Sequence, residues 1–176
     1  MSFESALKKT LHIEGGLNMD PDDNGNWTGV AKGVGELKGT KYGISAAQYP
    51  DEDIANMTTE RATFLYKRDY WDSLRLDEVK HETLQEKLFD TAVNMGVQTA
   101  AILLQKAVNF LLSANEAISV DGCVGPKTIK AVCSLHPGHA FALLAAFNGF
   151  RFMRYYEIIQ ANPIKRKYRF SWLSRI

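Results

Sequence analysis

The sequence has little cysteine, no long apolar run and almost no net charge. Its two cysteines, Cys123 and Cys133, are too few for the disulfide framework of a small secreted domain, so we expect two buried thiols. No stretch reaches the ~18 apolar residues of a transmembrane helix, and the longest candidate, residues 140–152, is interrupted by polar residues. A net charge of +1, from 21 basic and 20 acidic residues, argues against a general nucleic-acid binder.

A signal peptide is also missing, because the first residues hold no basic region followed by an apolar run. We therefore expect a protein made in the cytoplasm without a standard export signal. The 176 residues suffice for one domain with a proper core, or for one domain with a small appendage. A hydrophobic content of 45% and a charged content of 23% are ordinary for a soluble globular protein.

The basic residues are not evenly spread, because the last dozen residues are basic and aromatic. They include the following side chains: Lys165, Arg166, Lys167, Tyr168, Arg169, Phe170, Trp172 and Arg175. Such a tail could contact a polyanion such as nucleic acid, anionic lipid or a cell-wall polymer. Alternatively it is an amphipathic tail that folds back on the body of the protein.

Apolar residues recur at helical spacing over most of the chain. The pattern predicts helices over residues 2–14, 58–74, 84–95, 98–113, 126–135 and 137–160. Residues 15–45 are instead rich in Gly, Asp, Asn and Thr, and there we expect turns and short β pieces, above all at 41–44. Residues 46–57 are expected to form a short helix or a turn. The fold class is therefore mainly α, with a small irregular or β region near the N-terminus.

One acidic residue stands at the end of the first predicted helix. Glu14 is followed by Gly15 and Gly16, which supply the backbone conformation that ends a helix. The negative end of the helix dipole and the apolar neighbours would raise the pKa of Glu14. A carboxylic acid that stays protonated near neutral pH is what a general acid needs.

A carboxylate-rich loop follows this glutamate. Glycoside hydrolysis commonly uses a second carboxylate as base or nucleophile, and Asp20, Asp22 and Asp23 are near enough in sequence to face Glu14 across a turn. Asp20 precedes a proline and is held extended, so it could point into a cleft. Asp23 precedes Asn-Gly and could instead cap the turn. The alternative is that all three aspartates only order the loop.

A helix that delivers one glutamate, then a small β or loop lobe, then a helical lobe, is the organisation of lysozyme-like enzymes. Specific motifs resemble glycoside hydrolase family 108, the N-acetylmuramidases of bacteria and phages. They are Glu14-Gly15-Gly16, Asp20-Pro21-x-Asp23-x-Gly25, Thr40-x-Tyr42-Gly43-Ile44-Ser45 and Phe89-Asp90-x-Ala92-Val93-Asn94-x-Gly96. The peptidoglycan-binding region of that family is resembled by Leu104-Gln105 and Asp121-Gly122-x-x-Gly125-Pro126-x-Thr128.

Two features depart from the family pattern. Leu17 stands where an aromatic residue usually follows the glycine pair, which weakens one sugar contact at most. Residues 26–39 form an insertion where many members run almost directly into the Tyr-Gly-Ile piece. Because of this insertion, the position of a second carboxylate is not transferred from the family.

The resemblance implies that Glu14 is the catalytic acid, which protonates the β-1,4 glycosidic oxygen between N-acetylmuramic acid and N-acetylglucosamine. It divides the chain into a lysozyme-like catalytic part, 1–96, and a helical peptidoglycan-binding part, 97–176, packed together as one compact unit. We expect no cofactor, no metal site, peptidoglycan as the partner rather than nucleic acid, and a monomer. Access to the wall would need a holin-like or other non-standard route, which suits a phage or prophage lysis protein or a secretion factor.

Three further residues are candidates for binding the sugar. Tyr42 and Ser45 fit a β turn at the floor of a cleft, where the ring or hydroxyl could touch sugar; core packing of Tyr42 is the alternative. Asn94 lies on an apolar helix, so we expect a buried amide that binds a sugar acetamido group or makes a structural bond. His136 and His139 have metal-like spacing but no further ligand cluster, so no zinc site is predicted.

Two rival functions remain open. A lytic transglycosylase needs only one acid, because the substrate's own hydroxyl replaces water. A catalytically idle wall-binding or secretion-accessory protein could keep the same fold, although the presence of Glu14 favours an enzyme.

Overall fold

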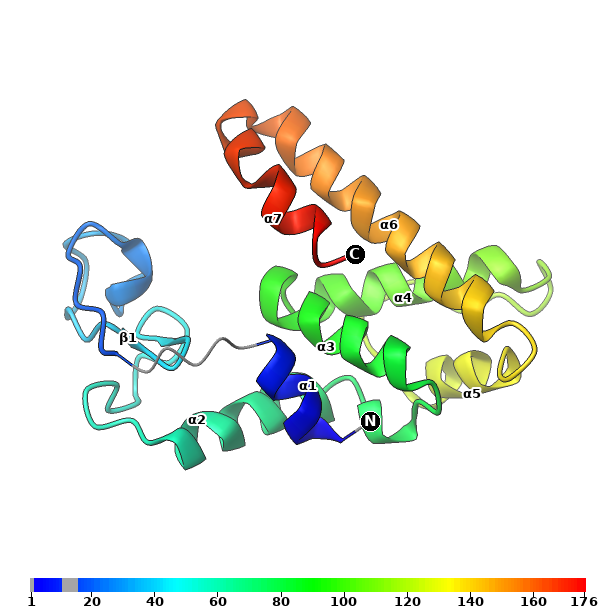
Figure 1. Cartoon of the computed structure of the whole chain (residues 1–176), viewed down its shortest axis with the longest axis horizontal. Coiled ribbons are helices and arrows are strands. Elements are labelled where there is room, and N and C mark those ends of the chain that lie inside the picture. Colours follow the sequence, from blue (N-terminus) through cyan, green and yellow to red (C-terminus); the bar gives the residue numbers. More distant parts are fainter. Residues whose placement is uncertain (1, 11–15) are drawn as a thin grey trace. The chain divides into compact units, whose positions relative to one another are not determined.

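The computed structural model describes residues 2–10 and 16–176 (Figure 1). The chain forms two compact units. We name Leu7–Lys67 the loop unit, and Met1–Ala6 together with Arg68–Ile176 the helical unit. Helix α1 (Phe3–Thr10) begins in the helical unit, and the predicted extension of this helix to Glu14 lies outside the described residues.

The loop unit contains little regular structure, as its Gly- and Asp-rich sequence predicts. Its described elements after α1 are the 3₁₀ turn η1 (Asn24–Asn26), strands β1 (Thr40–Lys41) and β2 (Ile44–Ser45), and helix α2 (Thr59–Tyr66). The two strands pair antiparallel, with Thr40 opposite Ser45. Tyr42 and Gly43 connect them with φ angles of 51° and 74°, the positive values that a two-residue type I′ hairpin requires.

The helical unit contains most of the regular structure. Its elements are η2 (Lys67–Asp72, π-helical, begun one residue earlier in the loop unit), η3 (Leu76–Glu78), α3 (Glu82–Met95), α4 (Val97–Leu111), α5 (Pro126–Ser134), α6 (Ala140–Ala161), η4 (Pro163–Tyr168) and α7 (Arg169–Leu173). Helix α4 packs against both α3 and α6. The fold is mainly α and lysozyme-like, as the sequence predicts.

Three aromatic side chains form a cluster in the core of the helical unit. Phe3, Trp71 and Phe89 contact one another edge to face, with ring centroids 5.5–5.8 Å apart. All three are buried. Because each of these side chains removes a large apolar area from water, this cluster joins α1, η2 and α3.

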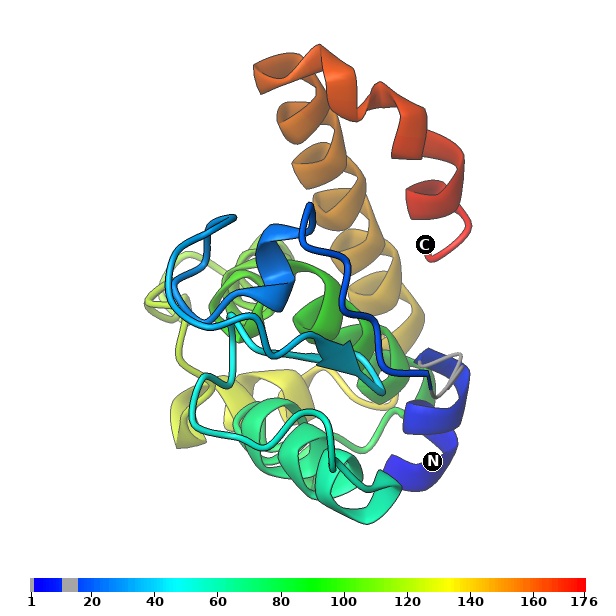
Figure 2. The same cartoon turned by 90° about the vertical axis from the view of Figure 1, so that its left-hand side faces the viewer.

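The C-terminal segment folds back along α6, which confirms one of the two interpretations of the basic tail. Figures 1 and 2 both show α7 side by side with α6. Trp172 of α7 stacks on Tyr155 of α6 at a centroid distance of 5.0 Å and an interplanar angle of 15°. Arg175 also forms an ion pair with Asp90 of α3 at 2.7 Å.

The structure also tests two smaller expectations about local structure. Of the two forms expected for residues 46–57, turns are observed and a helix is not. The helix predicted over residues 58–74 is α only to Tyr66 and continues as the π-helical η2.

The prediction of two buried thiols is wrong, because Cys123 is exposed and Cys133 is half-buried. Cys123 lies in the loop before α5, where backbone and side-chain bonds hold the chain without a buried side chain at that position. None of the described helices combines the length and the hydropathy that crossing a bilayer requires.

Candidate functional site

Glu14, the predicted general acid, lies outside the described residues, so the structure describes the site from the segment that follows it. That segment pairs with the hairpin. The backbone N–H of Asn18 donates to the carbonyl of Thr40 at 2.8 Å, and the N–H of Thr40 donates back at 2.9 Å. Gly39 has a φ of +83°, and a Cβ atom there would lie 2.5 Å from the Asn18 carbonyl oxygen. Only glycine therefore permits this close pairing.

Asn26 holds the loop together from inside. Its side chain is fully buried; Nδ2 donates to the carbonyl of Asp20 at 2.9 Å and Oδ1 accepts from the Thr40 hydroxyl at 2.7 Å. Its backbone carbonyl accepts the N–H groups of Lys38 and Gly39. The sequence does not predict this role for Asn26, because the only signal is an Asn within a turn-rich segment.

The two candidate second carboxylates, Asp20 and Asp23, both lie exposed on this loop and both bond local backbone. Asp20 Oδ1 accepts the N–H of Asp22 at 2.9 Å, and Asp23 Oδ1 accepts the N–H of Gly25 at 2.8 Å as the cap of η1. Asp22, the third candidate, pairs with Lys32. These contacts order the loop, which is the structural alternative stated above. A catalytic role for Asp20 or Asp23 stays a prediction.

The structure places Tyr42 and Ser45 in the same loop unit as these aspartates. Both are half-buried. The Tyr42 carbonyl accepts a hydrogen bond from the hydroxyl of Tyr66, while its ring lies 5.5 Å from Lys41 Nζ. Ser45 lies beside the aspartate loop, since a Cβ atom on Gly25 would be 3.9 Å from Ser45 Cβ. Hairpin and aspartate loop are therefore in contact at Gly25 and Ser45.

A hollow of about 390 Å³ opens in the loop unit. Leu17, Leu37 and Ile54 supply apolar walls. Half of the lining residues are charged: Glu36, Lys38, Asp51, Glu52 and Asp53. None of the predicted site residues that the structure describes lines this hollow. Hydrogen bonds from the Asn56 side chain and backbone lower the pKa of Asp53 below its ordinary value, so this carboxylate is charged at neutral pH. Apolar walls with a few converging polar groups are typical of a small-ligand site.

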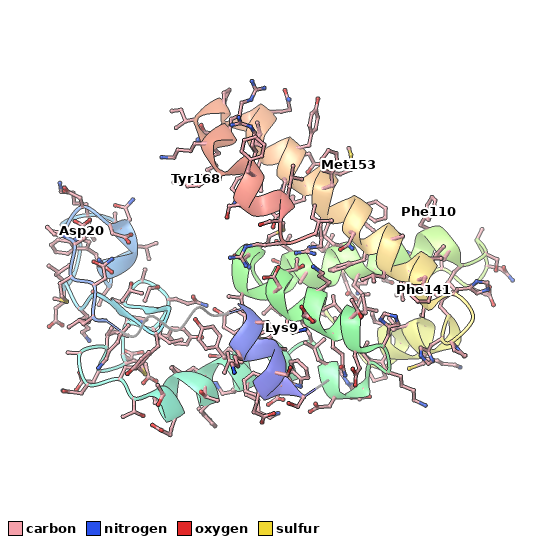
Figure 3. The ribbon with its side chains drawn as sticks, viewed as in Figure 1. Lys9, Asp20, Phe110, Phe141, Met153 and Tyr168 are labelled. Atoms are coloured by element: carbon pink, nitrogen blue, oxygen red, sulfur yellow. The ribbon has the colours of Figure 1, made fainter. Side chains whose placement is uncertain are left out.

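A second hollow, of about 370 Å³, lies on the helical unit between α4 and α6. Phe110, Phe150, Phe152 and Met153 line it; Phe110 and Met153 are labelled in Figure 3. No charged or hydroxyl side chain is among its lining residues. Because such groups orient a sugar, the hollow of the loop unit is the better candidate for sugar binding.

The expectation that Asn94 is a buried amide is wrong. Asn94 is exposed, and its Nδ2 donates to the carbonyl and to Oδ1 of Asp90, one turn earlier, at 2.7 and 3.1 Å. The buried stripe of α3 passes through Leu88 and Ala92. Asn94 lies on the same side as buried Asp90 but one turn later, in the last turn of α3, past Ala92, the last buried residue of this helix.

The motif of the predicted peptidoglycan-binding region forms a clasp. Gln105, buried on α4, donates through Nε2 to Asp121 Oδ1 at 2.8 Å and to the Cys123 carbonyl at 3.0 Å. Its Oε1 accepts the N–H of Gly122 at 2.9 Å. The Gln105 bond and the Cys123 N–H lower the pKa of Asp121. These residues hold the loop before α5 onto α4, and the exposed Cys123 lies on that loop.

Among residues 2–10 and 16–176, no group of His, Cys, Asp or Glu side chains is arranged to hold a metal ion. His136 lies beside His81, with ring centroids 6.5 Å apart, while His139 is exposed next to α6.

Comparison with known proteins defines first the fold and then the family. The structure is similar to that of SagA from Brucella abortus, with a TM-score of 0.67 and 21% sequence identity, over 98% of this chain and 88% of that chain. At this identity the likeness shows the fold. No curated protein matches the sequence.

The sequence matches the family glycosyl hydrolase 108 over residues 7–96 and a predicted peptidoglycan domain over residues 99–176. The chain belongs to the glycosyl hydrolase 108 family.

Proposed function

We propose that this protein is an N-acetylmuramidase, which hydrolyses the β-1,4 bond between N-acetylmuramic acid and N-acetylglucosamine in peptidoglycan. The observation that carries the proposal is the family match over residues 7–96, which includes Glu14 and is followed by a predicted peptidoglycan domain. The division into a catalytic part, 1–96, and a wall-binding part, 97–176, belongs to the proposal. Family membership and the second domain support peptidoglycan hydrolysis in general; the particular bond follows from the motif resemblance.

In the proposed reaction, Glu14 donates a proton to the glycosidic oxygen as the bond to the sugar breaks. Positive charge then develops on the sugar, and a carboxylate stabilises it or activates water. Asp20 is our first candidate for that carboxylate, with Asp23 as the second. Both are exposed on a loop that Asn26 holds in place. Tyr42 and Ser45, on the hairpin that pairs with this segment, would contact the sugar.

Clearing of purified cell walls by the wild type and by Glu14→Gln tests the general acid. Glutamine keeps the shape of the side chain but donates no acid proton, so we expect kcat to fall by at least ~100-fold. Glu157→Gln is the matched control, because Glu157 is exposed on α6 and should leave clearing unchanged. Equal clearing by wild type and Glu14→Gln, with both folded by circular dichroism, would eliminate the proposed acid.

The same reaction mixtures decide between hydrolysis and its closest rival. Reducing muramic ends support the muramidase, whereas anhydro-muramic ends would identify a lytic transglycosylase. If wild-type protein binds walls but releases no sugar, the non-catalytic accessory function replaces the proposal. Asp20→Asn and Asp23→Asn, measured alongside, identify the second carboxylate as the position whose change abolishes turnover.

We also propose, from the family resemblance, that the protein acts at the wall after leaving the cytoplasm by a holin-like or other non-standard route. Wall lysis in cells that express the protein, with and without a coexpressed holin, tests this route. Lysis that depends on the holin supports it.

A further inference from the structure

The C-terminal segment concentrates positive charge on a chain that is otherwise acidic. Residues 158–176 contain five of the 21 basic residues and none of the 20 acidic ones. The remaining 157 residues carry 16 basic and 20 acidic residues, so their net charge is negative. A field of one sign on this segment attracts an anionic partner.

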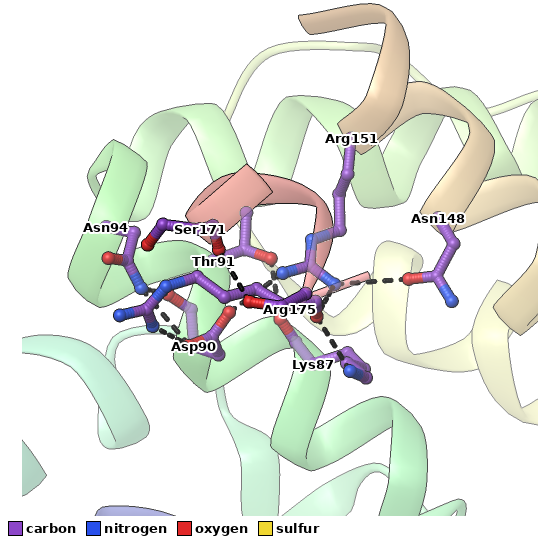
Figure 4. A network of polar contacts seen from close by, with 9 residues as sticks. Lys87, Asp90, Thr91, Asn94, Asn148, Arg151, Ser171 and Arg175 are labelled. Atoms are coloured by element: carbon purple, nitrogen blue, oxygen red, sulfur yellow. Dashed lines mark hydrogen bonds and ion pairs between the residues drawn. The ribbon is translucent and has the colours of Figure 1, made fainter. Parts of the chain in front are cut away.

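One side of the segment is used to fix it to the helical unit. Figure 4 shows Arg175 at the centre of this contact. Its guanidinium pairs with Asp90, and its backbone carbonyl accepts hydrogen bonds from Lys87 Nζ at 2.7 Å and Arg151 Nη1 at 3.0 Å. Arg151 is fully buried and pairs with the same Asp90 at 2.8 Å. The segment is therefore held at a defined place on the unit.

The rest of the segment carries exposed apolar and basic side chains. Phe170 precedes Trp172 by two residues, about 200° around α7, and is 71% exposed. Ile164, in η4, is 77% exposed. We name the following six exposed residues the C-terminal basic surface: Ile164, Lys165, Arg166, Lys167, Arg169 and Phe170. Charge and apolar area are adjacent in it, since the Arg169 guanidinium lies 4.3 Å from the centroid of the Phe170 ring.

We propose that the C-terminal basic surface binds an anionic lipid bilayer. Lys and Arg pair with lipid phosphates, and aromatic and aliphatic side chains enter the boundary between head groups and acyl chains. A soluble polyanion such as an anionic wall polymer would satisfy the charges, and a nucleic acid could also stack a base on Phe170, but neither would take the aliphatic Ile164 out of water. The exposure of Ile164 therefore favours the bilayer. This proposal is independent of the hydrolase activity.

Flotation of the full-length protein with lipid vesicles tests the proposal. Equal parts of phosphatidylglycerol and phosphatidylcholine should bind the wild type at 0.1 M NaCl, whereas phosphatidylcholine alone should not. The charge variant Lys165→Gln/Arg166→Gln/Lys167→Gln/Arg169→Gln should bind about 600-fold more weakly, because each of the four basic residues near an anionic surface strengthens binding about five-fold. The apolar variant Ile164→Ser/Phe170→Ser should bind at least ~10-fold more weakly, because both side chains lose a hydrocarbon environment.

The matched control is Lys80→Gln/Lys106→Gln/Lys127→Gln/Lys130→Gln, which neutralises four exposed lysines, one before α3 and three on α4 and α5. It should change vesicle binding less than two-fold, and circular dichroism should show all variants folded, because none removes a contact with Asp90 or Tyr155. If the wild type does not float with anionic vesicles, the proposal fails. It also fails if the apolar variant binds as the wild type does, since the surface then recognises charge alone. Binding to purified cell walls is measured in parallel. If the charge variant loses wall binding but still binds vesicles, the surface recognises a wall polymer instead of a bilayer.

Discussion

The loop that follows Glu14 and the helices of the helical unit are held together by different forces. Between Gly16 and Gly43 the buried residues are Asn26 and Gly39, neither of which has an apolar side chain of any size. Helix α4 alone buries Leu103, Leu104 and Val108, among others. Burial of apolar area therefore orders the helices, whereas directional hydrogen bonds order the loop.

This difference bears on what each region can carry. A loop that is ordered by the backbone and by one buried amide can leave its carboxylates in solvent, as Asp20 and Asp23 show. A packed helix has no such freedom on its inner face, where an unpaired polar atom is costly. Arg151 is buried on α6, where Asp90 and the Arg175 carbonyl receive its two terminal nitrogens, while its buried Nε has no hydrogen-bond partner among the described residues. The polar chemistry of a sugar site is therefore easier to place in the loop unit.

The largest effect is expected from removing a buried apolar side chain from the core of the helical unit. Phe89 is fully buried on α3 against Phe3 and Trp71. Phe89→Ala should lower the free energy of unfolding by about 3–5 kcal/mol, because it removes a large buried side chain and leaves a cavity. Urea denaturation followed by circular dichroism measures the loss.

Phe89→Leu is the control, because leucine fills most of the same space and should cost less than half as much. If alanine costs no more than about 1 kcal/mol, burial at Phe89 is not what stabilises the helical unit.

A change at Asn26 sharpens the comparison, because it should act through hydrogen bonds alone. Asn26→Ala leaves the Asp20 carbonyl and the Thr40 hydroxyl without their buried partner. We expect the free energy of unfolding to fall by about 2 kcal/mol. Backbone amide exchange should rise at Lys38 and Gly39, which bond the Asn26 carbonyl, while exchange within α4 stays unchanged.

Asn26→Asp separates the two side-chain bonds, because a carboxylate still accepts from Thr40 but donates nothing to Asp20. Because the fully buried carboxylate then faces the Asp20 carbonyl without a donor, its cost at neutral pH should exceed that of the alanine variant. An alanine variant with unchanged exchange at Gly39 would show that the strand pairing, not Asn26, orders the loop.

The same contrast explains how much of the fold the sequence predicts. Helices α3 to α6 follow from apolar periodicity, because each buries one stripe of its own sequence. The hairpin follows from Tyr42-Gly43, where a glycine supplies the positive φ that the turn requires. Local patterns are sufficient wherever the stabilising partner lies within a turn or two of the chain.

The candidate site is less predictable, because its contacts are between polar residues distant in sequence. Asn26 bonds Asp20 and Thr40, six and fourteen positions away, and no composition rule selects such partners. The bonds that Asp20 and Asp23 make with the N–H groups of Asp22 and Gly25 are instead local, and turn chemistry predicts bonds of this kind. Asn94 illustrates the converse error, since a position two residues past the buried stripe of α3 was expected inside. Family motifs identified the residues, but only coordinates show what each one bonds.

The last prediction concerns Tyr42, where local stability and function should oppose each other. Tyr42 has a φ of 51°, a left-handed conformation that is unfavourable for a bulky residue and readily adopted by asparagine. Asn-Gly is also a preferred pair for a type I′ turn, so Tyr42→Asn should raise the free energy of unfolding by up to about 1 kcal/mol.

If the ring of Tyr42 contacts the sugar, the same substitution should lower kcat/KM for wall clearing about five-fold, the effect of losing one aromatic contact of about 1 kcal/mol. Tyr42→Phe keeps the ring and should retain activity, which makes it the matched control. A Tyr42→Asn variant that is more stable and fully active would show that the ring does not contact substrate. Strained backbone of this kind usually persists where a function requires it. That result would therefore mean that sugar binding is not the function that keeps a tyrosine at this turn.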